Sequence, residues 1–232
     1  MFSKTRERLR LEDELLERVQ KAEIKYRWTV AASKSLLASV VPGQPMEIEV
    51  ASAIERAAAA EHEALERYQL VLSIFTGLVV YGRTPCFRDR LDLLLTRAME
   101  ATAADMGILY IANPKRGWII EAQSGFGRLV LRSLQRAGAA KSMCGQVLRT
   151  AQPLVVDNVA DSPLITGKQL RDVLLAVGAH AAMTTPILAA GTVLGVISVY
   201  YRTATRPTLD QRMEMQRLAG EAAGIIKRQR AG

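Results

Sequence analysis

The stretch that decides the fold runs from residue 141 to residue 201. Its first part reads Ser142-Met-Cys-Gly-Gln-Val-Leu-Arg-Thr150, and Ala-Gln-Pro then leads into the apolar run Leu154-Val-Val156. Residues 145–150 are predicted to form a short helix. A turn follows, and residues 154–156 have the β-branched composition of a strand.

The second part of this stretch predicts a loop, a helix and a hairpin. Residues 157–163 are acidic and rich in Asn, Ser and Pro, which is typical of a loop. A helical pattern follows over residues 166–177. The last two strands are joined at Ala189-Ala-Gly191, because glycine near a short break between two β-branched runs indicates a hairpin.

The last strand, up to Tyr201, is apolar on both faces. Side chains alternate along a strand, which predicts two sets that point in opposite directions. One set is Val193, Ile197 and Val199, and the other is Leu194, Val196 and Tyr200. A strand without a polar face must be covered on both sides. We expect helices on one side and loops that enclose a pocket on the other.

The order and spacing of these elements resemble the GAF family of small-molecule sensor domains. The residues that carry the resemblance are 145–153 ahead of Val155-Val-Asp157, then Asp161-Ser-Pro163, Thr185-Pro-Ile-Leu188 and Leu194-Gly-Val-Ile-Ser-Val199. The resemblance extends over residues 85–228. It implies an α/β (α+β) fold with an antiparallel sheet flanked by helices, and a sensory rather than catalytic role.

Two long helical patterns precede this region. One runs from Thr5 to about Val40, the other from Met46 to about Tyr81, and the proline-rich break 41–45 separates them. The predicted seam of the second helix is Ile54, Ala58, Leu65, Tyr68, Leu72, Phe75 and Val79, which has coiled-coil spacing. The pattern leaves open whether the helices form a hairpin or pair across a dimer. We therefore expect a helical region over residues 1–84 and a GAF domain over residues 85–232.

Further elements are predicted on either side of the central stretch. Residues 87–104 read as a helix, and residues 107–112 and 118–122 as paired strands. Residues 124–141 contain apolar residues that could form a helical turn, but their glycines favour a mobile loop. Thr208-Leu-Asp-Gln211 has the form of a capping box and predicts a helix that ends near residue 228.

Composition indicates a folded protein of the cytoplasm. Hydrophobic residues make up 49% of the chain and charged residues 23%, so extensive disorder is not expected. There are only 2 cysteines and the N-terminus shows no signal peptide, which favours a reducing compartment. The most apolar run, residues 70–81, is shorter than the ~20 residues that span a bilayer, so we expect no membrane span.

The net charge does not identify a nucleic-acid-binding protein. It is +8, yet the densest basic clusters lie at the two chain ends and the other basic residues are mixed with acidic ones. Solvated helix ends account for these clusters, and nucleic acid is not expected as a partner.

Cys144 is the basis of the main alternative hypothesis about function. It precedes a short predicted helix, and a helix N-terminus can lower the pKa of a thiol. The sequence also resembles the free methionine-R-sulfoxide reductases, which are GAF domains with Cys-Gly at this place. That family uses further cysteines downstream, and residues 175–183 contain none. A thiol-based redox enzyme is therefore the alternative hypothesis, and a small residue that lines the domain is the preferred interpretation.

Other candidate residues give weaker signals. His180 is a possible haem or metal ligand, but no cysteine or carboxylate accompanies it, which favours a structural role. Asp157 and Asp161 are expected to cap turns or to bind ligand donors. The cyclic-nucleotide signature of some GAF domains is not found, and Cys144 lacks the histidine that usually follows the cysteine of bilin-binding relatives.

These observations predict a non-enzymatic cytoplasmic sensor or regulatory protein with no identified cofactor. The resemblance and the strand alternation imply a ligand pocket lined by Tyr110, Cys144, Asp157, Leu170, Leu174, Thr184 and Ser198. The ligand is an unspecified small molecule, the chain is expected to form a homodimer, and a separate signalling protein is a possible partner. An interaction scaffold with an empty GAF core is a further alternative.

Overall fold

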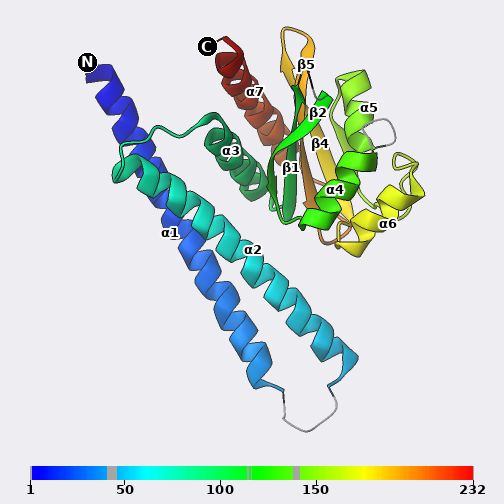
Figure 1. Cartoon of the computed structure of the whole chain (residues 1–232). Helices are drawn as coiled ribbons and strands as arrows, with labels where there is room; N and C mark the ends of the chain where they lie inside the picture. The colour runs from blue at the N-terminus through cyan, green and yellow to red at the C-terminus, as the bar shows by residue number, and fades with distance from the viewer. Residues whose placement is uncertain (1, 41–45, 114, 116, 138–141, 232) are drawn as a thin grey trace. The chain divides into compact units, whose positions relative to one another are not determined.

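The chain divides into two compact units, Met1–Pro85 and Cys86–Gly232. The computed structural model describes all residues except 1, 41–45, 114, 116, 138–141 and 232 (Figure 1). The break predicted at residues 41–45 lies outside the described residues.

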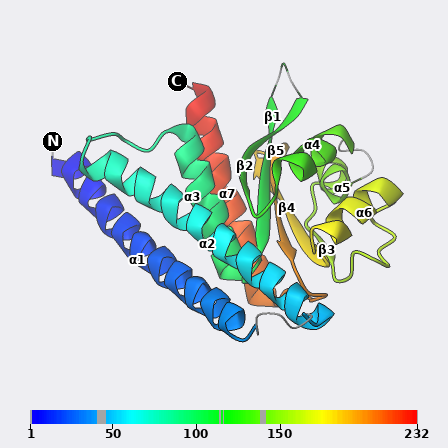
Figure 2. The same ribbon diagram turned by 60° about the horizontal axis from the view of Figure 1, so that its bottom comes forward.

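The first unit is a helical hairpin. Helix α1 (Phe2–Ala38) and helix α2 (Ile48–Val79) lie side by side in both views (Figures 1 and 2). The Nη2 atom of Arg8 donates a hydrogen bond to the carbonyl of Leu78 at 3.2 Å, and the rings of Tyr26 and Tyr68 stack with centroids 6.3 Å apart. Within one chain the two helices therefore fold back on each other.

The buried face of α2 differs from the predicted seam by one position. The fully buried residues are Ala64, Arg67, Val71, Ile74 and Leu78. Each lies one residue before a member of the predicted set from Leu65 to Val79, whose own members are half-buried or exposed. The helix is apolar on two adjacent stripes, so the three- and four-residue spacing alone selects the wrong stripe.

The second unit is built on a five-stranded antiparallel sheet with strand order β2-β1-β5-β4-β3. The strands are β1 (Met106–Asn113), β2 (Gly117–Ser124), β3 (Leu154–Val156), β4 (Ala181–Ala189) and β5 (Thr192–Tyr201). Strand β5 lies at the centre, between β1 and β4, and it is buried along most of its length. The predicted fold class, an antiparallel sheet flanked by helices after two long helices, is confirmed.

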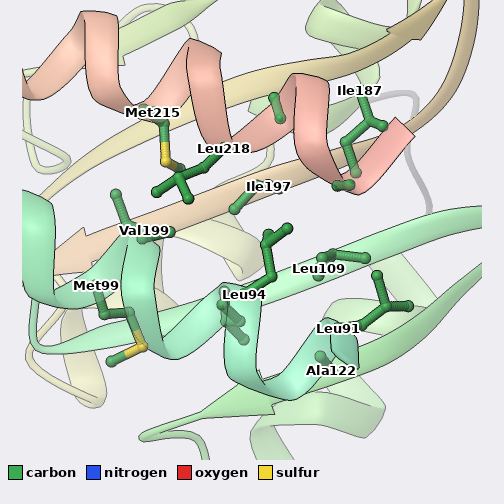
Figure 3. Close-up of a cluster of buried hydrophobic side chains, with 14 of the residues drawn as sticks. Leu91, Leu94, Met99, Leu109, Ala122, Ile187, Ile197, Val199, Met215 and Leu218 are labelled. Atoms are coloured by element: carbon green, nitrogen blue, oxygen red, sulfur yellow. The ribbon is translucent and has the colours of Figure 1, made fainter. Parts of the chain in front are cut away.

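One face of the sheet is covered by helices α3 (Phe87–Thr102) and α7 (Leu209–Ala231) (Figure 1). Figure 3 shows side chains of α3, such as Leu94, and of α7, such as Leu218, meeting Ile197 of β5. The predicted capping box starts α7: the amide of Thr208 donates to Oε1 of Gln211 at 2.8 Å, and the amide of Gln211 donates to Oγ1 of Thr208 at 3.2 Å.

The opposite face carries a second, separate core. It is covered by α4 (Arg128–Ala137), α5 (Met143–Thr150), α6 (Lys168–Ala176) and the connection from β3 to α6. Helix α4 corrects the prediction of a loop over residues 124–141, of which residues 138–141 lie outside the described part. Gly125, at φ +81°, forms a turn ahead of the helix, so this glycine marks its boundary and does not interrupt it.

The hairpin between β4 and β5 is tight, as predicted. Ala190 and Gly191 both have positive φ, +47° and +79°, which is the backbone of a two-residue hairpin turn. Pairing shifts just after the turn and leaves Leu194 without a partner residue on β4. The prediction for Leu194 is therefore wrong: it joins the core beneath α3 and α7 instead of facing the same way as Val196.

Candidate functional site

A cavity of about 190 Å³ lies between the sheet and the layer formed by α4, α5 and α6. Among the described residues its lining is formed by Tyr110, Trp118, Leu134, Gln135, Ser142, Met143, Cys144, Leu148, Ile165, Leu170, Leu174, Val196 and Tyr200. Most of these side chains are apolar, and the polar ones are amide, hydroxyl or thiol groups. An apolar enclosure with a few polar groups is the usual construction of a small-molecule site.

Helix α5 places the thiol of Cys144 against the sheet. Ser142 is the N-cap, and its Oγ accepts a hydrogen bond from the amide of Gly145 at 3.2 Å, which fixes the first turn. The helix ends at Ala151, whose φ is +54°. Because α5 is short and fixed at its start, the position of the Cys144 side chain over β5 is well defined.

A line of polar groups runs from the cavity wall into the sheet. The Sγ atom of Cys144 lies 3.4 Å from Oγ of Ser198, which lies 2.9 Å from Oγ1 of Thr184. Ser198 and Thr184 are paired residues of β5 and β4, and both are fully buried. Burial raises the pKa of the Cys144 thiol, so this side chain is a neutral thiol at neutral pH.

Two tyrosines form the wall on the sheet side. Tyr110 comes from β1 and Tyr200 from β5, and burial raises the pKa of both phenols well above the usual value. The ring of Tyr200 packs edge-on against Phe126 with the centroids 5.2 Å apart. Both phenols are therefore neutral hydrogen-bonding groups held on rigid strands.

The connection from β3 to α6 closes one side of the cavity through Ile165. An Nη2 atom of Arg171, on α6, donates hydrogen bonds to the carbonyls of Ser162 at 3.0 Å and Ile165 at 2.8 Å. The amide of Val159 donates to the carbonyl of His180 at 2.7 Å. These bonds attach the connection at both ends, which holds Ile165 in place.

The structure brings most of the predicted site residues together. Tyr110, Cys144, Leu170 and Leu174 line the cavity, while Thr184 and Ser198 lie behind Cys144 as its hydrogen-bonded support. Asp157 is placed elsewhere: it is exposed, and its Oδ2 lies 3.8 Å from Nε of Arg206. Ligand binding by any of these residues stays a prediction.

Sequence reasoning did not select several lining residues. They are Trp118, Leu134, Gln135, Ser142, Met143, Leu148, Ile165, Val196 and Tyr200. Val196 and Tyr200 alternate with Ser198 on one face of β5, so strand alternation could have identified both. Leu134 and Gln135 could not be found while residues 124–141 were interpreted as a loop.

Metal and thiol chemistry have little support in the described part of the chain. His180 is exposed, and only its backbone makes hydrogen bonds that tie it to neighbouring segments. Among the described residues no group of three potential metal ligands comes together. Both cysteines, Cys86 and Cys144, are free.

Comparison with known proteins identifies the family of this chain. A family model described as GAF domain matches residues 87–227. The chain belongs to the GAF family, which confirms the resemblance seen in the sequence. No curated protein is similar enough to be matched. Helices long and apolar enough to span a bilayer are not found in the described residues.

Solved structures show the same fold at low sequence identity. A domain assigned to a two-component sensor histidine kinase protein from Sinorhizobium meliloti 1021 has a TM-score of 0.55 at 17% identity, and the match covers 64% of this chain and 95% of that one. A GAF domain/HD domain protein from Geobacter sulfurreducens has a TM-score of 0.54 at 16% identity, with 68% and 98% covered. The GAF domain of a phosphoenolpyruvate-protein phosphotransferase from Coxiella burnetii has a TM-score of 0.53 at 19% identity, with 70% and 91% covered.

Proposed function

We propose that this protein is a non-enzymatic sensor or regulatory protein that binds a small molecule in the cavity between the sheet and α4–α6. The observation that carries the proposal is the cavity itself. It lies between the sheet and a layer of helices, its walls are mainly apolar, and its polar groups include one thiol and two phenols. This arrangement fits binding and recognition.

The chemistry of the lining favours binding over turnover. A thiol mechanism needs a thiolate, and burial raises the pKa of Cys144. The other cysteine, Cys86, begins α3, which packs on the opposite face of the sheet, and is exposed. The thiol-based redox alternative therefore lacks an activated nucleophile and a resolving partner, and it is not favoured.

Signalling would pass from the domain to the helical hairpin or to a separate partner. In this proposal the protein works in the cytoplasm as a homodimer, and the ligand shifts a balance between two arrangements of its helices. A ligand can do so only if it binds the two arrangements with different affinity. The two free cysteines support a reducing compartment.

Thermal unfolding of the full-length protein against a library of small metabolites tests the proposal. A ligand at 100 times its Kd adds about 2.7 kcal/mol of stability, which raises the unfolding temperature of a domain of this size by roughly 5–10 °C. Native mass spectrometry of the freshly purified protein would show in parallel any small molecule that it retains, and whether it is a dimer.

A matched pair of variants locates the binding. Leu174→Phe fills the cavity from α6, whereas Leu129→Phe adds the same bulk at an exposed position of α4. A true ligand should lose its effect in the first variant and keep it in the second. Val196→Ile is a milder filling variant if Leu174→Phe does not fold. A library without a stabilising compound, or compounds that stabilise both variants equally, would refute ligand binding in this cavity.

A further inference from the structure

We infer that the cavity takes an uncharged, mainly apolar molecule about the size of one aromatic ring that carries a hydrogen-bonding group. This inference rests on the proposed function, because it names the chemical class of the ligand. Four properties of the cavity carry it: the charge of its described lining, its volume, the aromatic side chains in its walls and the hydrogen-bonding groups beside Cys144.

The charge of the described lining argues against an ionic ligand. None of the described lining residues is Lys, Arg, His, Asp or Glu. Burial also raises the pKa of Tyr110, Tyr200 and Cys144, so these groups provide no anion at neutral pH. A carboxylate, phosphate or ammonium group would lose its hydration here without gaining an opposite charge, and such a transfer is strongly unfavourable.

The volume limits the ligand to about one ring. A cavity of about 150 Å³ lined by apolar side chains holds one benzene molecule. The cavity here measures about 190 Å³, which leaves room for a ring with a short substituent. A haem or a linear tetrapyrrole is larger than this space.

The walls favour a flat ring. Aromatic residues make up 5% of the chain, yet Tyr110, Trp118 and Tyr200 are three of the thirteen lining residues that the structure describes. They come from three different strands, β1, β2 and β5, so their positions are set by the sheet. Aromatic faces and edges pack well against another ring.

Cys144 and the hydroxyl groups behind it can act as hydrogen-bond donors or acceptors. In the contacts of Ser198 with Cys144 and with Thr184, either atom can be the donor. Rotation of these hydroxyl and thiol hydrogens lets Cys144 present either its S–H or its sulfur lone pairs to the cavity. A hydroxyl or carbonyl on the ligand can therefore pair with this thiol.

Three probes of equal ring size test the charge of the ligand: benzyl alcohol, benzoate and benzylamine. The chain has 2 tryptophans, Trp28 on α1 and Trp118 in the cavity wall. In the full-length Trp28→Phe protein Trp118 is the remaining tryptophan, and its fluorescence reports on the partly exposed part of the cavity wall where it lies. We expect benzyl alcohol to change this fluorescence and to bind at least tenfold more tightly than either ion, a difference of about 1.4 kcal/mol. Leu174→Phe should abolish the response and Leu129→Phe should not.

The outcomes separate this inference from the function on which it rests. Benzoate or benzylamine binding as tightly as benzyl alcohol in a Leu174-dependent way would overturn the uncharged class and leave ligand binding intact. If all three probes fail to bind, the inference is also wrong. The proposed function fails only if the metabolite library, which includes larger and charged compounds, gives no cavity-dependent stabilisation either.

Discussion

Replacing Asp92 by asparagine should stabilise the second unit at neutral and alkaline pH. Asp92 lies on α3 beneath the sheet, and its side chain is 14% exposed. Burial raises the pKa of its carboxyl from 3.8 to about 6, Arg88 opposes this shift, and Asp89 and Glu121 add to it by repulsion. Asparagine keeps the shape of the side chain and carries no charge, so it removes the cost of a buried carboxylate.

The sign and size of the effect follow from proton binding. Because the pKa is higher in the folded state, the folded protein binds more protons than the unfolded chain between pH 3.8 and about 6. The contribution of Asp92 to stability is therefore fully present below pH 3.8 and is lost as pH rises through about 6. The shift corresponds to at most about 3 kcal/mol, at 1.36 kcal/mol per pKa unit. Asp92→Asn should remove this loss and be about 1–3 kcal/mol more stable than the parent at pH 8.

Urea unfolding at a series of pH values measures the effect. Trp118 fluorescence in the Trp28→Phe background follows the second unit alone. The control is Asp172→Asn, because Asp172 is exposed on α6 and its replacement should change stability by less than about 0.5 kcal/mol. Parallel pH profiles for the parent and Asp92→Asn, or a less stable variant at pH 8, would show that the burial argument is wrong.

Three further substitutions test the packing that positions the site. Gly195→Ala should destabilise the second unit by about 2–3 kcal/mol in urea unfolding, because the new Cβ would clash with the carbonyl oxygen of Tyr110. The control is Gly220→Ala on α7, where an added Cβ would meet no atom within 4 Å, and this variant should be equally stable or more stable. Arg171→Ala removes two hydrogen bonds to the connection between β3 and α6. Hydrogen exchange of the backbone amides in that connection should rise about tenfold or more. Unchanged exchange would show that packing alone holds the connection in place. Thr208→Ala removes half of the capping box of α7 and should cost about 1 kcal/mol in urea, with Thr208→Ser restoring most of the loss.

The strands and their pairing could largely be predicted from the sequence. The predicted strand 154–156 and the turn at residues 189–191 are found as expected, because alternation and glycine placement are local properties. The bulge at Leu194 could not be predicted, because it depends on how β5 pairs with β4. Its consequence is that one side chain of the central strand changes face.

The helices show where local patterns become ambiguous. The glycines in residues 124–141 favour a loop by composition, but Gly125 lies ahead of α4 and does not interrupt the helix. In α2 two apolar stripes run side by side, and only contact with α1 selects the one through Val71. The error in α2 arises because the sequence specifies spacing within a helix and not the partner that the helix packs against.

The candidate site depends on residues that are distant in the sequence. Strand alternation and the family layout indicated Tyr110 and Cys144, which do lie at the cavity. The same reasoning included Asp157, which follows β3 but is exposed and lies near Arg206. A loop side chain has no periodicity to indicate its direction, so its orientation is decided by tertiary contacts.

Under the proposed function, the central strand is the shortest physical route from the cavity to the rest of the domain. The two cores of the second unit lie on opposite faces of one sheet, and β5 contributes to both. Val196 and Tyr200 line the cavity, while Ile197 and Val199 pack beneath α3 and α7. A ligand that moved β5 would therefore act on both helices at once, because a close-packed interior transmits displacement. A ligand that moved only α4–α6 would leave α3 and α7 in place.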